Sequence, residues 1–422
     1  MSAALPPAAA NLALDERVAA LRAAGTDVLH LGFGESRLPV HPLLVEALGR
    51  GAGANAYGPV AGRPQVRAAV AGYFSRRGLR TVADQVVVGP GSKPLLLAVL
   101  AALGGPVVLP RPSWLTYAAQ AQVLGVDVEW VDAPDGLGGV TDPALLDVRL
   151  SDLAARPGDG HVPASVLLTS PDNPTGTTAP ADMVRAVVEV AVRHGLMVVS
   201  DEIYADVVHS PAARWLSPAS VAEPRTVVLT GLSKSLSLGG WRVGAARFPG
   251  TAEGSALRDR VVSFASQSWS NLAAPMQEVA AVAFSEPPEL VAYREQCTRL
   301  HGEVARAVHQ LLVDHGVPCP VPTGGFYVYP DLRPMADALA ARGVHGSGDL
   351  EAYLLEHHGV AALGAHRFGA SPGSLQLRLA TSMLYGETRQ AQEETLAAAD
   401  PCAVPHVAAA LDRLADVLAA LT

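Results

Sequence analysis

The sequence has few cysteines, no excess of positive charge and no sustained apolar segment at its start. Its three cysteines, Cys297, Cys319 and Cys402, are widely spaced, so neither a disulfide framework nor a metal cluster is indicated, and a reducing cytoplasm fits best. The net charge of −9, with no long basic run, argues against a nucleic-acid partner. The first residues also lack the basic region and apolar stretch of an export signal.

The longest apolar window, residues 94–110, does not predict a membrane span. Gly104-Gly105-Pro106 divides this window into a helix and a strand, and the whole is shorter than the ~20 residues that a span requires. With 49% hydrophobic residues, the chain can instead bury a large core. Its 422 residues are natural for two domains, by a guide of roughly 100–200 residues each. We therefore expect a soluble two-domain protein without a membrane partner.

Apolar runs alternate with amphipathic stretches, which predicts an α/β fold with a mostly parallel sheet covered by helices. Seven strands are expected in this sheet, near residues 86–88, 107–109, 126–131, 166–169, 197–201, 227–230 and 243–248. A smaller α+β domain should hold strands near 324–329 and 375–381, a long helix over 287–315 and a final helix over 408–420.

Three segments are expected from this pattern. Residues 1–50 should form an N-terminal arm and part of the small domain, and residues 51–286 the large domain. Residues 287–422 should complete the small domain and include the long interdomain helix. Within this last segment, the Gln/Glu/Ala-rich region 386–404 is a candidate insertion.

An amine and a guanidinium lie eight residues apart, at Lys234 and Arg242, among small residues. Lys234 follows one predicted strand and Arg242 precedes another, so both should border one crevice at the strand ends, where open α/β sheets bind ligands. This is the arrangement expected of a lysine that forms an imine with pyridoxal phosphate while an arginine holds the cofactor's phosphate. Because a single lysine is usually a solvated surface charge, the interpretation depends on other motifs.

Two further segments supply groups that this cofactor needs. Asp201 follows the apolar run 196–199 at a predicted strand end, and its carboxylate could pair with the protonated pyridine nitrogen. Tyr204 could donate to the ring's phenolate oxygen. Asn173 follows another predicted strand, and its turn can direct a side-chain amide to the same oxygen. The Asn-Pro turn alone would indicate only an ordinary turn, so its significance comes from agreement with the other motifs.

These motifs resemble those of the class I/II aminotransferases, within the fold-type I pyridoxal phosphate family, over nearly the whole chain. The matching motifs are Asn173-Pro-Thr-Gly176, Asp201-x-x-Tyr204, and Ser233-Lys234 with Gly240-Trp-Arg242. The resemblance implies that Lys234 is the Schiff-base lysine and proton carrier. It implies that the cofactor is held by Asp201, Tyr204, Asn173, Ser233 and Arg242. Catalysis would follow a ping-pong transfer of an amino group between an L-amino acid and a 2-oxo acid.

A small polar motif, Gly91-Ser92-Lys93, follows a predicted strand and opens a helical run. Backbone N–H groups and the Ser92 hydroxyl at a helix N-terminus make an anion site suited to a phosphate. The motif is a poor dinucleotide fingerprint because it lacks the third glycine. The resemblance also implies that Trp114 stacks on the pyridine ring, although a buried tryptophan is more often part of a core.

Arg378, in an alternating segment near the C-terminus, resembles the arginine that clamps the substrate α-carboxylate. A planar guanidinium suits bidentate recognition of a carboxylate. The alternative is a surface arginine on an edge strand. By the same resemblance, Gly34 contributes backbone beside that carboxylate, and Trp114 and Asn173 also contact the substrate.

Two residues resemble contacts that cross a subunit boundary. Tyr57 resembles the tyrosine that reaches the cofactor phosphate of a neighbouring subunit, and Ser270 a second contact of this kind. We therefore expect a homodimer with an isologous interface.

The chain departs from the family pattern at several positions. Ser36-Arg37 stands where many relatives carry a proline. Ser266 stands where dicarboxylate-specific members have an arginine, so a specialist of that type is less expected. Trp269 suggests a bulky pocket wall or a core residue. His366-Arg367 could contact a substrate side chain, although solvated loop residues are the preferred interpretation.

Two alternatives remain open, because a fold does not fix a reaction. The same scaffold and cofactor also serve specialised enzymes, such as cyclases, lyases and oxidases of amino acids. A more distant alternative is a non-enzymatic pyridoxal phosphate-sensing regulator. Such a regulator would need a basic DNA-binding module, and the stretch before Leu31 predicts only one Ala-rich helix.

Overall fold

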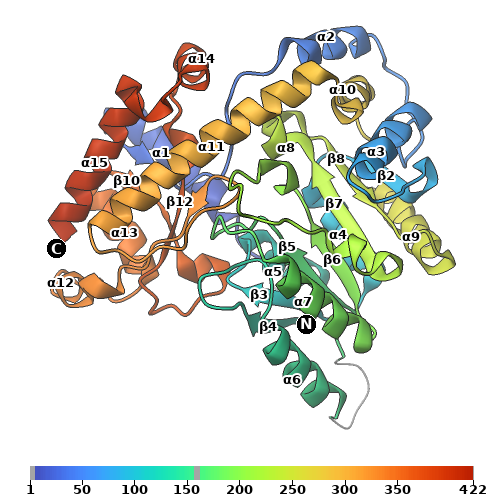
Figure 1. Cartoon of the computed structure of the whole chain (residues 1–422), viewed down its shortest axis with the longest axis horizontal. Coiled ribbons are helices and arrows are strands. Elements are labelled where there is room, and N and C mark those ends of the chain that lie inside the picture. The colour runs from blue at the N-terminus through green and yellow to red at the C-terminus, as the bar shows by residue number, and fades with distance from the viewer. Residues whose placement is uncertain (1–4, 156–161, 422) are drawn as a thin grey trace.

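The structure is a computed structural model that describes residues 5–155 and 162–421 (Figure 1). Within these residues, the main sheet has seven strands in the order β2-β8-β7-β6-β5-β3-β4. Only β8 runs antiparallel to its neighbours, β2 and β7. The strands are β2 Val86–Gly89, β3 Val107–Arg111, β4 Val128–Asp132, β5 Ser165–Thr169, β6 Met197–Asp201, β7 Thr226–Gly231 and β8 Gly244–Arg247. The predicted fold class, with its mostly parallel seven-stranded sheet, is confirmed.

Helices cover both faces of this sheet. One face packs against α4 (Ser92–Leu103), α5 (Leu115–Leu124) and α9 (Ala252–Ser268), and the other against α6 (Pro143–Ala154) and α7 (Ala181–Arg193). Every residue of β5, β6 and β7 is buried. This double burial explains why these strands are nearly continuous apolar runs rather than alternating ones.

The smaller part of the fold joins the two ends of the chain. β1 (Leu29–His30) pairs in parallel with β10 (Val360–Ala361). A three-stranded antiparallel sheet holds β11 (Leu363–Gly364), β12 (Leu377–Ala380) and β9 (Tyr327–Val328), in that order. In Figure 1, the blue helix α1 (Ala10–Ala23) lies among the red C-terminal helices. The segment boundaries after residues 50 and 286 stay predictions.

The long helix α11 (Pro288–Asp314) connects the two parts. A proline suits its first position, because that residue's N–H would have no intrahelical partner. No helix among the described residues has both the length and the low polarity needed to cross a membrane. The candidate insertion, residues 386–404, contains helix α14 (Arg389–Ala397). The remaining helices are α2 Pro42–Gly51, α3 Pro64–Arg76, α8 Leu232–Ser235, α10 Ala274–Ser285, α12 Ala336–Ala340, α13 Ser347–His358, α14 Arg389–Ala397 and α15 Pro405–Leu421.

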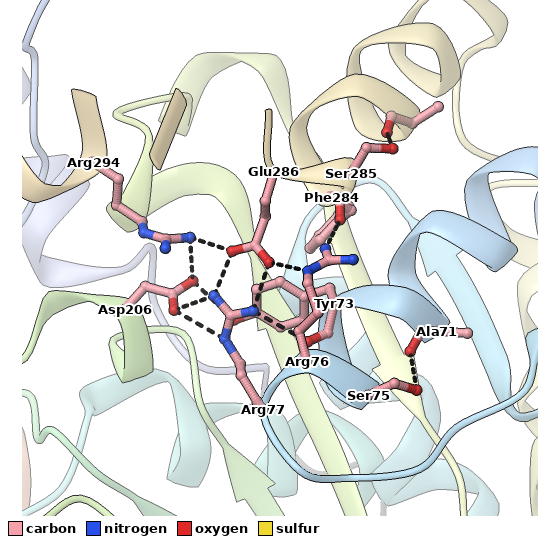
Figure 2. Close-up of polar contacts among 11 residues, drawn as sticks. Ala71, Tyr73, Ser75, Arg76, Arg77, Asp206, Phe284, Ser285, Glu286 and Arg294 are labelled. Carbon is pink, nitrogen blue, oxygen red and sulfur yellow. Dashed lines mark hydrogen bonds and ion pairs between the residues drawn. The ribbon is translucent and has the colours of Figure 1, made fainter. Parts of the chain in front are cut away.

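An ion network fixes the start of α11 to the large domain (Figure 2). Arg77 contacts Asp206 at 2.7 Å and Glu286 at 2.6 Å, and Arg294 contacts Glu286 at 2.5 Å. Tyr73 donates a hydrogen bond to Asp206 at 2.9 Å. Because these charges are mostly buried, each depends on its partners for compensation. The network therefore holds the loop after β6, which carries Asp206, against α11.

Candidate active site

A cavity of about 410 Å³, the candidate active-site cavity, opens at the carboxyl ends of β5, β6 and β7. This is the edge at which open α/β sheets bind ligands. Motifs that lie far apart in the sequence meet here. Of the predicted site residues, the cavity is lined by Gly34, Ser92, Lys93, Trp114, Asn173, Asp201, Tyr204, Ser233, Lys234, Arg242 and Arg378.

Lys234 lies on α8, the short helix directly after β7. Its ammonium donates a hydrogen bond to the Gly34 carbonyl at 2.5 Å. Burial, together with the positive charges of Arg378, Arg242 and Lys93, lowers the pKa of Lys234 to about 8, although the nearby Glu35 carboxylate opposes the change. A buried amine with a lowered pKa is suited to nucleophilic and proton-transfer chemistry near neutral pH.

Lys93 and Lys234 are the only two lysines in the 422-residue sequence. Both line this cavity. Lys93 lies 5.1 Å from the centre of the Trp114 ring, and burial lowers its pKa, assisted by the charge of Arg242. All the other residues in the combined count of lysines and arginines are arginines. Both ε-amines of the chain therefore lie in this cavity.

Asp201 ends β6, is buried and lines the cavity. Its Oδ2 accepts a hydrogen bond from the Tyr117 hydroxyl at 2.9 Å, and its Oδ1 accepts one from the Ile203 amide at 3.2 Å. Burial raises the pKa of Asp201 to about 6, and these hydrogen bonds oppose the rise. A carboxylate in this environment suits a protonated pyridine nitrogen, which would compensate its buried charge.

The Gly91-Ser92 segment forms a cradle beside Arg242. Gly91 has φ +95° at the N-terminus of α4, and a Cβ at this position would overlap the Arg242 guanidinium. Arg242 itself adopts a left-handed φ of +56°, which is uncommon for a residue with a side chain. A guanidinium against a helix N-terminus provides charge and N–H donors for a phosphate. The residues present therefore fit pyridoxal phosphate. They offer it the Lys234 amine, the Asp201 carboxylate, and a phosphate cradle made by Gly91-Ser92 and Arg242.

Arg378, from β12, is buried at the small-domain side of the cavity. One guanidinium nitrogen donates to Asn173 Oδ1 at 3.2 Å and another to the Gly32 carbonyl. Its Nε has no hydrogen-bond partner within the described residues. A buried guanidinium with unused donor capacity is suited to an anionic ligand such as a carboxylate.

Tyr204 is joined to a residue that the motifs did not indicate. Its hydroxyl lies 2.6 Å from that of Tyr327, whose oxygen also accepts a hydrogen bond from the Asn173 amide at 3.4 Å. The group of Asn173, Tyr204 and Tyr327 thus connects the edge of the main sheet to β9 near Lys234.

Tyr57 and Ser270 lie apart from the cavity within this chain. The Tyr57 side chain is 89% exposed, and Ser270 has a left-handed φ of +65° just beyond α9. An exposed tyrosine of this kind is available to a second subunit, so the two predicted cross-subunit roles stay predictions.

The departures from the family pattern also take defined places. Ser36 is buried and its hydroxyl lies 2.6 Å from that of Ser237, while Arg37 contacts Glu35 at 2.8 Å. Arg367 pairs with Glu351, and His366 contacts Ser347. These four side chains are not among the described residues that line the candidate active-site cavity, and neither are Ser266 and Trp269.

Several cavity residues were missed by the sequence motifs. The hydroxyls of Tyr117 and Thr169 lie 2.6 Å apart, and that of Tyr117 donates a hydrogen bond to Asp201. The charge of Glu35 opposes the lowering of the Lys234 pKa. Asn11 and Leu12 reach the cavity from α1. Tyr117 lies three residues after Trp114, and Glu35 directly after Gly34, so proximity to a motif was an available signal. For Asn11 and Leu12, which precede β1 by many residues, no such signal exists.

Known proteins agree with this fold and cavity. A family model described as aminotransferase class I and II matches residues 26–389. An aspartate aminotransferase from Geobacillus stearothermophilus is 31% identical over 396 residues, which cover 92% of this chain and 95% of that protein. An aspartate/prephenate aminotransferase from Cereibacter sphaeroides is 31% identical, over 86% and 89% of the two chains. The solved structure of Thermus thermophilus aspartate aminotransferase with maleate has a TM-score of 0.81 at 25% identity, covering 98% and 97%.

A lysine, a carboxylate and a phosphate cradle at the carboxyl edge of this sheet define the class of fold-type I pyridoxal phosphate-dependent enzymes. Within that class, the match over most of the sequence is decisive. The chain belongs to the class I and II aminotransferases, and it is a pyridoxal phosphate-dependent transferase.

Proposed function

We propose that the chain transfers an amino group between an acidic L-amino acid and a 2-oxo acid. The single observation that carries the acidic preference is Lys93. Arg378 can hold the α-carboxylate, Arg242 the cofactor phosphate, and Lys234 is needed for the chemistry. Lys93 is then a further cation lining the cavity, and it forms no ion pair among the described residues. A second carboxylate on the substrate would complement it.

The relatives support this choice. Two of the curated proteins similar to this chain are named aspartate aminotransferase and aspartate/prephenate aminotransferase. The serine at position 266 argued against one type of dicarboxylate specialist, but its side chain lies on α9 outside the cavity. We therefore infer that the Lys93 amine, which comes from α4, recognises the distal carboxylate, and that no arginine is needed at position 266.

The side chains divide the catalytic work among them. The cofactor, when bound, supplies an electron sink and carries the amino group between the two half-reactions. Arg378 orients the substrate by its α-carboxylate, which brings the α-proton within reach of the Lys234 amine. Lys234 removes that proton and returns one at the adjacent carbon of the cofactor. Asp201 keeps the ring nitrogen protonated, and Asn173 and Tyr204 donate to the ring oxygen.

We further propose a homodimer in which Tyr57 and Ser270 complete the neighbouring active site. The strongly exposed Tyr57 ring supports this assembly, because a large aromatic side chain on the surface is typical of an interface. A cytoplasmic setting is supported by the three cysteines, all of which are free.

The test is to follow the cofactor absorbance of the purified holoenzyme while single amino acids are added. Aspartate or glutamate should convert the cofactor to its amine form, and a 2-oxo acid should reverse the change. Phenylalanine and alanine serve as controls for the acidic preference. Ammonia release or oxygen consumption without reversal would instead identify a lyase or an oxidase. The Lys93→Met variant should raise KM for aspartate while leaving KM for phenylalanine unchanged.

A further inference from the structure

A second cavity, of about 400 Å³, lies against α11 and shares no lining residue with the active site. Its walls come from α11 and from residues 205–209, the loop that follows Tyr204. Arg294, Thr298 and Arg306 lie on one side of α11, because they are spaced in multiples of four residues. The polar lining is completed by Arg299, Glu295, Asp206 and His209.

Arg306 and His209 meet over a helical glycine. A Cβ on Gly302 would lie 2.7 Å from His209 Cβ and 2.9 Å from Arg306 Nη1. The bare backbone at Gly302 therefore allows the guanidinium and the imidazole to lie together. Within the described residues, Arg306 forms no hydrogen bond or ion pair, and both ring nitrogens of His209 are buried without a partner of normal hydrogen-bond geometry. A weak contact with the Gly325 backbone supports the ring.

The His209 ring requires an explanation, since buried polar atoms usually have a partner. Arg306 is exposed and lines the same cavity. Burial, together with the charge of Arg306, lowers the pKa of His209 to about 4, so the ring is neutral at physiological pH. A neutral imidazole retains one N–H donor. The pair thus presents a fixed positive charge and an adjacent neutral donor.

The acidic residues nearby are already engaged. Asp206 contacts Arg77 at 2.7 Å and accepts from the Tyr73 hydroxyl, as Figure 2 shows. Arg294 forms an ion pair with Glu286 in the same cluster, and Arg299 pairs with Glu303 at 2.7 Å. Glu295, an exposed rim residue, is the remaining carboxylate of the lining. Among the lining residues, the three arginines outnumber the two carboxylates, and Arg306 is the arginine without a carboxylate partner among the described residues.

We propose that this cavity binds a small oxyanion, namely a phosphate group, free or carried on a small metabolite. Arg306 supplies the main charge-assisted hydrogen bonds and His209 a neutral one, which would satisfy both groups. The inference is independent of the amino-acid substrate. It adds a second anion site on the far side of the loop that follows Tyr204.

Isothermal titration calorimetry of the holoenzyme with inorganic phosphate tests the site, at an ionic strength held constant with sodium chloride. The holoenzyme is used because its cofactor already fills the phosphate cradle. We expect saturable binding that the Arg306→Gln variant weakens by about tenfold or more, from the loss of a charge-assisted contact. Arg306 is exposed, so this variant should fold. Arg193→Gln, which removes an ion-paired arginine on α7, should bind as the wild type does.

Two further titrations complete the test, one with an active-site variant and one with a phosphate ester. Arg378→Lys should leave phosphate binding unchanged, because Arg378 belongs to the other cavity. Weakening in Arg378→Lys but not in Arg306→Gln would overturn the proposal, as would equal affinity in all variants. Glycerol phosphate distinguishes the source of the ligand: tighter binding than inorganic phosphate indicates a phosphorylated metabolite, and equal or weaker binding indicates the free anion.

Discussion

The hydroxyl of Tyr117 donates a hydrogen bond to Asp201 at 2.9 Å, and both side chains are buried. Tyr117 comes from α5 and Asp201 from the end of β6, so the contact joins a covering helix to the sheet. Since burial raises the pKa of Asp201 to about 6 and this hydrogen bond opposes the rise, Tyr117 helps to keep the carboxylate ionised. The contact also fixes the direction in which the carboxylate points.

The Asp201→Asn variant should reduce kcat by about 10²–10³-fold, the usual loss when one preorganised electrostatic group is removed from a reacting centre. An amide cannot stabilise a protonated ring nitrogen as a carboxylate does. The measurement is steady-state turnover of the holoenzyme, with cofactor content determined in parallel. Glu202→Gln is the matched control, because Glu202 is the adjacent buried carboxyl and contacts Ser200 and Ser217 instead. Equal losses in the two variants would show that Asp201 has no special role.

Reduction of the holoenzyme with borohydride should attach the cofactor to Lys234 alone. The experiment is unusually clean because the chain has only one other lysine, Lys93, in the same cavity. Peptide mapping by mass spectrometry should find the label between Arg225 and Arg242. The Lys93→Arg variant should keep the label and Lys234→Arg should lose it. A label on Lys93 would reverse the assignment of the two amines.

The Arg378→Lys variant should lower kcat/KM for the amino acid by about 10- to 150-fold. This range corresponds to roughly 1.5–3 kcal/mol for hydrogen bonds to a charged group, and a lysine cannot reproduce the planar two-point contact. Cofactor affinity should not change. Arg367→Lys is the control, because this arginine pairs with Glu351 outside the cavity. A fall in kcat/KM of similar size in both variants would argue against Arg378 as the carboxylate clamp.

The stability of the apoprotein should fall as pH rises, in part because of Glu202. Burial raises the pKa of this carboxyl from 4.5 to about 7, although Ser217 and Ser200 donate to it. Below about 4.5 the group is protonated in both states. Between about 4.5 and 7 the folded state holds a proton that the unfolded state releases, so stability is lost as pH rises through this window. Above about 7 the loss is complete, on the order of 3 kcal/mol.

Glu202→Gln removes this titration. Thermal unfolding of the apoprotein across the pH window should therefore give a flatter profile for the variant than for the wild type. Glu253→Gln, at an exposed carboxylate paired with Arg225, should retain the wild-type profile. Parallel profiles for wild type and Glu202→Gln would mean that Glu202 is ionised in the folded protein.

The sequence predicts the large sheet well because its central strands are buried on both faces. A strand such as β7 must then be a continuous apolar run, which is visible without any structure. The functional residues Asp201 and Lys234 follow directly at the carboxyl ends of such strands. Their positions in the chain therefore indicate their positions in space.

Other parts of the site lack such a signal. Tyr327 meets Tyr204 only because β9 of the small domain packs against the large-domain wall, and nothing local in Gly324–Tyr329 indicates that contact. Asn11 reaches the cavity because α1 packs on the C-terminal part of the chain through Leu14 and Val18. Such contacts depend on how distant segments pack, which one sequence without coordinates does not specify.

Mixed dimers test whether Tyr57 serves the neighbouring active site. A chain with Tyr57→Phe retains Lys234, and a chain with Lys234→Ala retains Tyr57. If Tyr57 acts across the interface, each mixed dimer contains one complete site, and refolding the two chains together should restore activity at limiting cofactor. The control is a mixture of Asp201→Asn and Lys234→Ala chains. Both residues line the same cavity of one chain, so no mixed dimer of this pair has a complete site. Recovery in the control, or no recovery in the Tyr57 mixture, would contradict the cross-subunit role.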